Sequence, residues 1–143
     1  MGTLCRLQIQ ASPVKAKKIS KEVFALWEDI QIKTNILDSK SEISILNSKK
    51  EHKVSERLYE IISTGYVMSK KTNGYFDMTI GTLTTDLFSG KKLTDAQIKI
   101  ILSKVNYQKI NMDNNTKTIW ITDPALKLDV WGISKGYVAD QTL

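Results

Sequence analysis

The residues from Thr72 to Leu83 carry the most unusual mixture of side chains in this chain of 143 residues. They begin with a turn signal, Asn73-Gly74, because both residue types tolerate positive φ. The aromatic pair Tyr75-Phe76 follows, and then the carboxylate of Asp77 and the hydroxyl of Thr79. In an extended segment these last two side chains would share a polar face over an apolar one. The pattern is typical of the edge of a ligand site and, equally, of a buried strand with polar ends.

A second stretch with chemical potential lies near the end of the chain. Leu126–Val130 alternates like a strand, Gly132 ends it, and we expect a new helix to begin at about Lys135. The N–H groups at a helix start bind anions, and a lysine there adds a positive charge. Because strand-to-helix turns with one glycine and one lysine are common, an ordinary structural turn remains open beside an anion site.

The rest of the pattern predicts the elements that would position these stretches. Alternation over Leu4–Gln10 predicts a strand whose buried face includes Cys5. Capping signals and apolar spacing predict four helices. They run from Ser12-Pro13 to about Lys33, from Ser39 with Glu42, from Ser55, and from Thr94 with Gln97, the last with a buried stripe of Ile98, Ile101, Leu102 and Val105.

Turn residues Asp113–Thr116 between Ile110–Met112 and Thr118–Ile121 predict a hairpin, with Leu126–Val130 as a third strand of that group. Strands and helices are therefore segregated along the chain. This order predicts a single domain over residues 1–143 of the α+β class, with a largely antiparallel sheet packed against amphipathic helices.

Composition restricts the classes of function. The chain has 41% hydrophobic residues and a formal net charge of +6, yet only Arg6 and Arg57 are arginine. Scattered lysines favour a solvated surface over a nucleic-acid groove, although a basic field still favours an anionic ligand. The single cysteine excludes an internal disulfide, and His52, the only histidine, has no partner for zinc and is expected in a solvated loop. No apolar run is long enough to cross a bilayer, and no secretion leader is visible.

Four motifs in order resemble those of the ApbE-type flavin transferases, which move FMN from FAD onto a threonine of a target protein. Met1-Gly2-Thr3 is similar to the first motif of the family. Asp38–Asn47, with Ser41-Glu42 and Leu46-Asn47, is similar to its second. Thr72–Thr79 resembles the central motif. Leu128-Asp129 with Gly132-Ile133-Ser134-Lys135-Gly136-Tyr137 and Asp140 resembles its Gly-Ile-Ala-Lys-Gly-Tyr motif.

The resemblance implies FAD as substrate, magnesium as metal and a flavin-acceptor protein as partner. Carried over position by position, the implied FAD contacts are Met1, Leu37, Tyr75, Phe76, Asp77, Asp129 and Lys135. The backbone carbonyl of Gly132 is the position that helps to hold magnesium, and no catalytic residue is assigned. Hard oxygen ligands fit that ion, and a divalent cation would neutralise charge on the departing AMP.

Three features depart from the family pattern. Leu37 stands where an aromatic residue is common, and Trp131 stands where a small one is common. Family members are also substantially longer, and their second half completes the metal site. We therefore expect this chain to correspond to the N-terminal part of such an enzyme. We also expect Leu126–Val130 to expose apolar surface that a missing half or a second copy of the chain would cover.

Three functions stay open on the sequence alone. The first is FMN transfer from FAD to protein, with hydrolysis of FAD to FMN and AMP as a variant. The second is a flavin-binding module without transfer activity, and the third is a lysine-rich interaction protein. The family resemblance also implies an extracytoplasmic location, with a lipoprotein anchor in the membrane.

Overall fold

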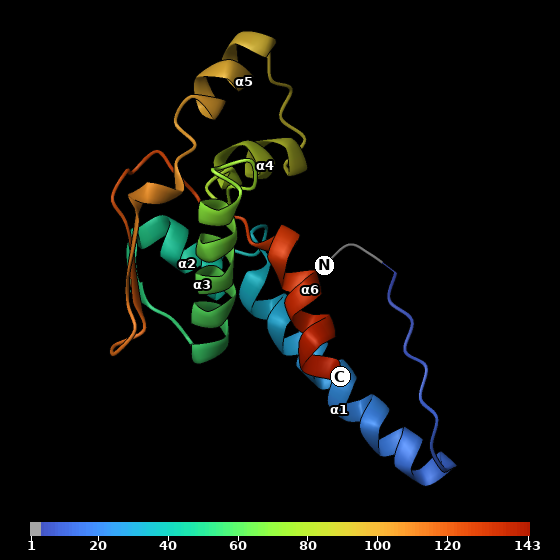
Figure 1. Cartoon of the computed structure of the whole chain (residues 1–143). Helices are drawn as coiled ribbons and strands as arrows, with labels where there is room; N and C mark the ends of the chain where they lie inside the picture. The colour runs from blue at the N-terminus through green and yellow to red at the C-terminus, as the bar shows by residue number, and fades with distance from the viewer. Residues whose placement is uncertain (1–3) are drawn as a thin grey trace.

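The computed structural model describes residues 4–143 and confirms the α+β class, with six α-helices and one antiparallel sheet in that range (Figure 1). Met1 lies outside the described residues. The helices are α1 (Pro13–Thr34), α2 (Glu42–Lys49), α3 (Glu56–Lys71), α4 (Gly81–Phe88), α5 (Asp95–Leu102) and α6 (Trp131–Thr142), with a short 3-10 helix η1 (Tyr107–Lys109). The strands are β1 (Glu51–Lys53), β2 (Ile110–Asp113) and β3 (Thr118–Ile121).

The predicted hairpin is confirmed as β2 and β3, which pair antiparallel with Ile110 opposite Ile121. Strand β1 joins the other edge of β3, so the sheet order is β1-β3-β2. His52 belongs to β1, opposite Ile119, and is half-buried, so its predicted place in a solvated loop is wrong. The backbone of Lys117 has φ 58, because the turn before β3 requires one left-handed residue.

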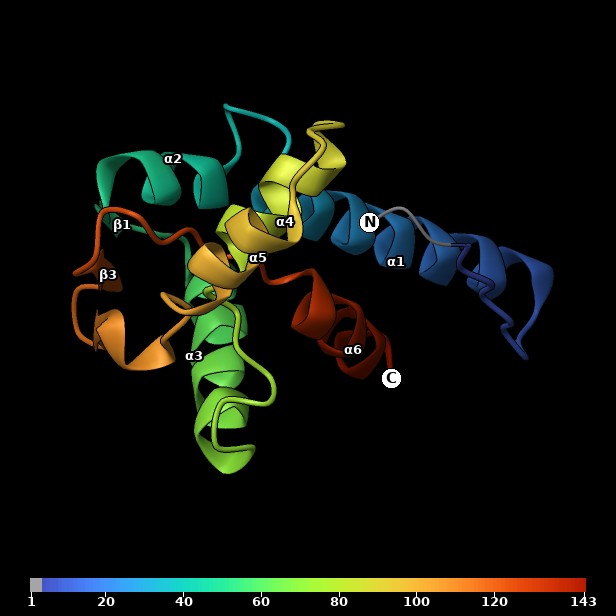
Figure 2. The ribbon, with the colours of Figure 1, turned by 90° about the horizontal axis from the view of Figure 1, so that it is seen from above.

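Helix α3 lies between the sheet on one side and the pair α1–α6 on the other (Figures 1 and 2). Two polar contacts fix this arrangement. The indole of Trp27 donates to the hydroxyl of Thr142 at 3.0 Å, which ties the end of α6 to α1. Arg57 of α3 contacts Asp29 of α1 at 2.7 Å. The core between these layers includes Ile30, Ile43, Leu46, Leu58, Ile61, Ile62, Met78, Ile119, Leu126, Leu128 and Val130.

Most predicted helix starts are confirmed. The hydroxyl of Ser55 accepts from Leu58, and Thr94 forms a reciprocal capping box with Gln97. Helix α2 exists, but Ser41 rather than Ser39 caps it. Glu42 is its first residue and accepts instead from the N–H of Ser55 at 2.9 Å, so this carboxylate links α2 to the start of α3.

The predicted strand over Leu4–Gln10 is wrong. The segment is irregular and, among the described residues, pairs with no other strand. Alternation stabilises a strand only where a neighbouring strand takes its backbone groups. Leu4 is 96% exposed, and Cys5 is exposed rather than buried.

Leu126–Val130 forms no strand of the sheet, which corrects a second prediction. Its one sheet-type contact is a parallel bridge between Lys127 and Ile80. Instead, the side-chain amide of Asn47 takes both backbone groups of Leu128, donating to its carbonyl at 2.9 Å and accepting from its N–H at 2.6 Å. Leu126, Leu128 and Val130 are buried, so the expected exposed apolar face is also wrong.

The stretch Thr72–Leu83 is neither extended nor a strand. Residues 72–79 form successive turns, and helix α4, which the sequence analysis missed, begins at Gly81. Helices α4 and α5 pack against each other at one end of the molecule (Figure 1). No residue of α5 is buried, so its predicted buried stripe is wrong, because α5 packs on α4 and not into the core.

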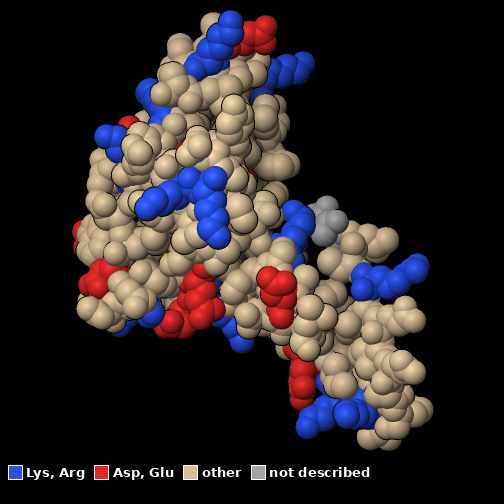
Figure 3. All heavy atoms as spheres, viewed as in Figure 1, with Lys and Arg blue, Asp and Glu red and all other residues tan. Residues whose placement is uncertain are grey.

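Among the described residues, no helix is long and apolar enough to span a membrane. Lysines and arginines are scattered over the visible face instead of lining one groove (Figure 3). This distribution agrees with the solvated surface predicted from the composition.

Candidate functional site

An open cleft of about 890 Å³ lies where the turns after α3, the start of α6 and the segment before β2 meet. Its walls come from three parts of the chain that are far apart in sequence. The lining residues are Asn73, Gly74, Tyr75, Phe76, Asp77, Ile80, Thr84, Leu102, Val105, Asn106, Tyr107, Gln108, Asp129 and Gly132.

The first wall is the series of turns from Thr72 to Thr79. Asn73 and Gly74 have φ of 50° and 81°, which confirms the predicted turn at positive φ. The hydroxyl of Thr72 accepts from the N–H of Phe76 at 3.0 Å and so closes the turn. Tyr75 is 98% exposed at the rim, and its ring is free to stack on a planar ligand.

Asp77 and Asp129 line the same cleft, as predicted from the sequence. The N–H of Asp129 donates to the carbonyl of Met78 at 2.8 Å, which joins the two stretches through the backbone. Asp129 is 8% exposed, and its Oδ1 accepts from the N–H of Trp131 at 2.9 Å. Its carboxylate therefore takes the N–H of the first residue of α6 in a local turn while it borders the cleft.

Helix α6 begins at Trp131, one turn earlier than predicted, and Gly132 brings its first turn to the cleft wall. A Cβ at Gly132 would lie 3.0 Å from Cε2 of Phe76, so glycine lets the ring pack against the helix start without a shift. In this first turn the N–H of Trp131 donates to Asp129 and the N–H of Ile133 donates to the carbonyl of Val130, so among the described residues only the N–H of Gly132 is left for a ligand. This end of the cleft thus combines a helix N-terminus with an aromatic ring.

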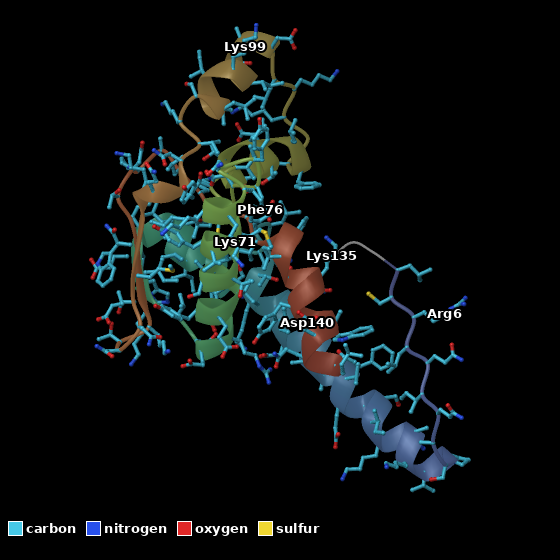
Figure 4. The ribbon with its side chains drawn as sticks, in the orientation of Figure 1. Arg6, Lys71, Phe76, Lys99, Lys135 and Asp140 are labelled. Atoms are coloured by element: carbon cyan, nitrogen blue, oxygen red, sulfur yellow. The ribbon has the colours of Figure 1, made fainter. Side chains whose placement is uncertain are left out.

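Two other predicted residues lie away from the cleft lining. Lys135 lies exposed on the second turn of α6 (Figure 4), and its Nζ donates to the carbonyl of Trp131 at 3.3 Å. Leu37 is 52% exposed and borders a separate hollow beside Asn47 and Lys127. Their roles toward FAD, like that of Met1, stay predictions.

The start of α6 is the second wall of the cleft. The third wall, which runs from Val105 to Gln108, was not predicted from the sequence. The side chain of Asn106 caps η1 by accepting from the N–H of Gln108 at 2.9 Å. The ring of Tyr107 packs edge-on against Tyr66 of α3, with ring centroids 5.7 Å apart. Asn106 was a sequence signal for a turn here, because asparagine often caps its own turn. It gave no signal that this turn borders the cleft.

The donor set for a metal ion is partial. No group of three His, Cys, Asp or Glu side chains comes together within residues 4–143. The oxygen donors of the cleft are the carboxylate of Asp129, backbone carbonyls such as that of Gly132, and the carboxylate of Asp77, which already accepts three hydrogen bonds within the protein. Magnesium commonly takes one or two carboxylates and fills its remaining positions with substrate phosphates and water. The cleft fits such a partly substrate-held ion.

The fold and the cleft define an α+β protein with a long, open site that combines aromatic rings, two carboxylates and a helix N-terminus. The sequence profile of the ApbE family matches residues 1–143, and the chain belongs to that family. It is 28% identical over 92 residues to the FAD:protein FMN transferase of Klebsiella pneumoniae (strain 342), covering 62% of this chain and 29% of that protein.

Solved structures show the same fold. The ApbE protein of Thermotoga maritima superposes with a TM-score of 0.82 at 20% identity, covering 93% of this chain and 45% of that one. The flavinyl transferase ApbE of Pseudomonas stutzeri, in its apo form, gives 0.76 at 20% identity, covering 89% and 42%. Vibrio cholerae flavin transferase ApbE gives 0.75 at 20% identity, covering 96% and 46%. The chain thus spans less than half the length of these relatives.

Proposed function

We propose that this chain is the FAD-binding part of a FAD:protein FMN transferase, which moves FMN from FAD onto a threonine of an acceptor protein. The observation that carries the proposal is the cleft that unites the central motif, at Tyr75–Asp77, with the last motif, at Asp129 and Gly132. Membership of the ApbE family and the named Klebsiella relative support the choice of FAD among long anionic ligands.

The chemistry of the cleft suits a dinucleotide. Tyr75 and Phe76 offer faces for a planar ring. The first turn of α6 and the net charge of +6 favour the pyrophosphate. Asp129 repels phosphate but accepts hydrogen bonds from hydroxyl and amino groups, so it favours the sugar or ring portions of the ligand.

Magnesium belongs to the same proposal, with the Gly132 carbonyl as its protein ligand and Asp129 within the same cleft. When bound, it would neutralise charge on the AMP that leaves as the threonine oxygen forms its bond to the FMN phosphorus. The residues of this chain bind and orient FAD, and the flavin-acceptor protein supplies the hydroxyl.

The experiment that tests the proposal is to incubate the chain with FAD, magnesium and a threonine-containing acceptor peptide, and to follow the peptide by mass spectrometry. The matched control peptide has alanine in place of threonine. Covalent FMN on the threonine peptide alone supports transfer. Folded protein that binds no flavin contradicts the proposal and favours an interaction protein.

A flavin-binding module without transfer activity is the second candidate. The cleft itself favours it, because the rings of Tyr75 and Phe76 and the start of α6 account for flavin binding without a transfer step. Bound flavin without a labelled peptide supports this candidate, whereas free FMN and AMP without a labelled peptide would indicate FAD hydrolysis. We also propose that the chain forms a homo-oligomer, and light scattering with and without FAD tests this.

For location, we propose the extracytoplasmic, lipoprotein-anchored state that the family resemblance implies. Fractionation of cells that produce the protein from its full natural reading frame tests this. Recovery with the membrane supports the anchor, and recovery in the cytoplasm contradicts it.

A further inference from the structure

Asp77 uses both of its carboxylate oxygens inside the protein. Its Oδ1 accepts from the N–H of Thr79 at 2.8 Å and from the Thr79 hydroxyl at 2.7 Å. Its Oδ2 accepts from the N–H of Tyr107 at 2.8 Å. The Thr79 hydroxyl in turn accepts from the N–H of Asn106 at 2.9 Å, and Thr79 is fully buried. Two of these four bonds connect the central motif to a segment 27 and 30 residues further along the chain.

This network ends on the third wall of the cleft. Asn106, Tyr107 and Gln108 all line it, and η1 is too short to hold them by its own helical bonds. The N–H groups of Asn106 and Tyr107 face acceptors only because Asp77 and Thr79 lie beneath them. Three of the roughly four lone-pair positions of this carboxylate are thus occupied within the protein.

We propose that Asp77 is a positioning residue, which acts on the ligand through the Asn106–Gln108 wall and not by direct contact. Thr79 is its partner, because the Thr79 hydroxyl donates to the Asp77 carboxylate and accepts from the N–H of Asn106. The exposed amide of Gln108 then becomes a polar group that the wall presents to the ligand. The hydrogen bonds alone support the role of Asp77 in positioning the wall, and only the identity of the ligand rests on the proposed function.

Amide hydrogen exchange in the ligand-free protein tests the role of Asp77 in positioning the wall. Asp77→Asn places an NH₂ group where carboxylate oxygens accept, and Thr79→Val removes the hydroxyl while it keeps shape and the charge of Asp77. Each variant is expected to speed exchange at Asn106 and Tyr107 by about tenfold or more. Unchanged exchange at both amides in both variants would overturn the proposal.

Asp113→Asn is the matched control, because Asp113 makes similar bonds in the β2–β3 turn, far from the cleft. Its Oδ1 accepts from the N–H of Asn115 at 2.8 Å and its Oδ2 from the hydroxyl of Thr116 at 2.8 Å. This variant is expected to leave exchange at Asn106 and Tyr107 as in the wild type.

FAD titration separates positioning from direct contact. If Asp77 acts through the wall, Asp77→Asn and Thr79→Val each weaken FAD binding by about tenfold, and the double variant is no weaker than either single one. If Thr79→Val binds like the wild type while Asp77→Asn does not, the carboxylate contacts the ligand and the proposal is wrong. Wild-type protein that binds no FAD would refute the proposed function, whereas hydrogen exchange would still decide the role of Asp77.

Discussion

At the scale of single residues, Gly132 and Gly136 belong to the same helix but differ in what surrounds them. A Cβ at Gly132 would meet the Phe76 ring at 3.0 Å, whereas a Cβ at Gly136 would meet nothing within 4 Å. Alanine usually stabilises a helix by about 1 kcal/mol relative to glycine. Gly136→Ala should therefore raise the free energy of unfolding by up to about 1 kcal/mol.

Gly132→Ala should have the opposite effect, because the crowded methyl group costs about 1–3 kcal/mol and displaces Phe76 from the cleft wall. Urea denaturation of both variants measures the free energies of unfolding, and FAD titration measures the effect on the cleft. A stabilised Gly132→Ala variant that retains full FAD affinity would show that Phe76 does not depend on this glycine.

Tyr137 gives the fold a pH dependence at high pH. Burial, followed by the hydrogen bond that Tyr137 donates to Glu60, raises the pKa of Tyr137 to about 12 from an ordinary value of 10.0. Because the folded state holds the phenol in its protonated form, this contribution to stability is complete below pH 10 and is lost as the pH rises toward 12. The free energy of unfolding of Tyr137→Phe should therefore fall less steeply over that range than that of the wild type. Parallel curves would contradict the assignment.

At the scale of elements, Asn47 is the side chain that holds Leu126–Val130 against α2. Its amide satisfies both backbone groups of Leu128 in the buried core, in place of a neighbouring strand. Asn47→Ala leaves an N–H and a carbonyl unpaired and should lower the free energy of unfolding by about 2–4 kcal/mol.

Asn114→Ala is the matched control for Asn47, because Asn114 bonds Lys117 in an exposed turn. Its effect on the free energy of unfolding should stay within about 0.5 kcal/mol. Chemical denaturation measures both free energies of unfolding. Equal decreases in the two variants would show that the hydrogen bonds from Asn47 to Leu128 do not stabilise the fold more than an exposed turn contact does.

Ser134 is a buried hydroxyl of α6 for which the described residues supply no hydrogen-bond partner. The resembling family motif has alanine at this position. Because an unpaired buried hydroxyl costs about 1–3 kcal/mol, Ser134→Ala should raise the free energy of unfolding by at least about 1 kcal/mol. Ser20→Ala in α1 is the control, because its hydroxyl has a partner, the carbonyl of Lys17 at 3.0 Å, and the gain from helix propensity there is at most about 0.5 kcal/mol. A gain in Ser134→Ala no larger than that of Ser20→Ala would indicate that the hydroxyl finds a partner.

Elements with a local signal were predictable. Ser55 and the Thr94–Gln97 pair marked helix starts because capping is a contact between neighbours in sequence. The strands expected at Leu4–Gln10 and Leu126–Val130 failed because alternation reports a buried face but not the partner of the backbone. At the second segment that partner is the side chain of Asn47, which lies far away in the sequence.

Part of the cleft was predictable, because two local sequence motifs marked two of its walls. The shared location of Asp77 and Asp129 followed from the two motifs, and the structure confirms it. The Asn106–Gln108 wall could not be predicted, since it reaches the site only through the long-range bonds from Asp77 and Thr79. Nothing local in that segment distinguishes it from an ordinary turn before a strand.

At the scale of the whole molecule, the chain forms a layered fold whose cleft is built entirely from its own residues. The solved relatives share this fold while this chain covers 45% or less of the Thermotoga and Pseudomonas proteins. Binding of FAD and transfer of FMN are therefore separable questions. In the proposed function, FAD binding depends on the residues of the cleft, and FMN transfer depends also on an acceptor protein and on magnesium.

The most direct test of the central claim is an NMR titration of the folded chain with FAD, followed through the backbone amides. We expect saturable, one-to-one binding, with the largest shifts at Tyr75, Gln108 and Gly132 around the cleft. Residues of the separate hollow beside Leu37 and Lys127 should shift little. No saturable binding by the folded protein, or shifts centred on that hollow instead of the cleft, would contradict the account.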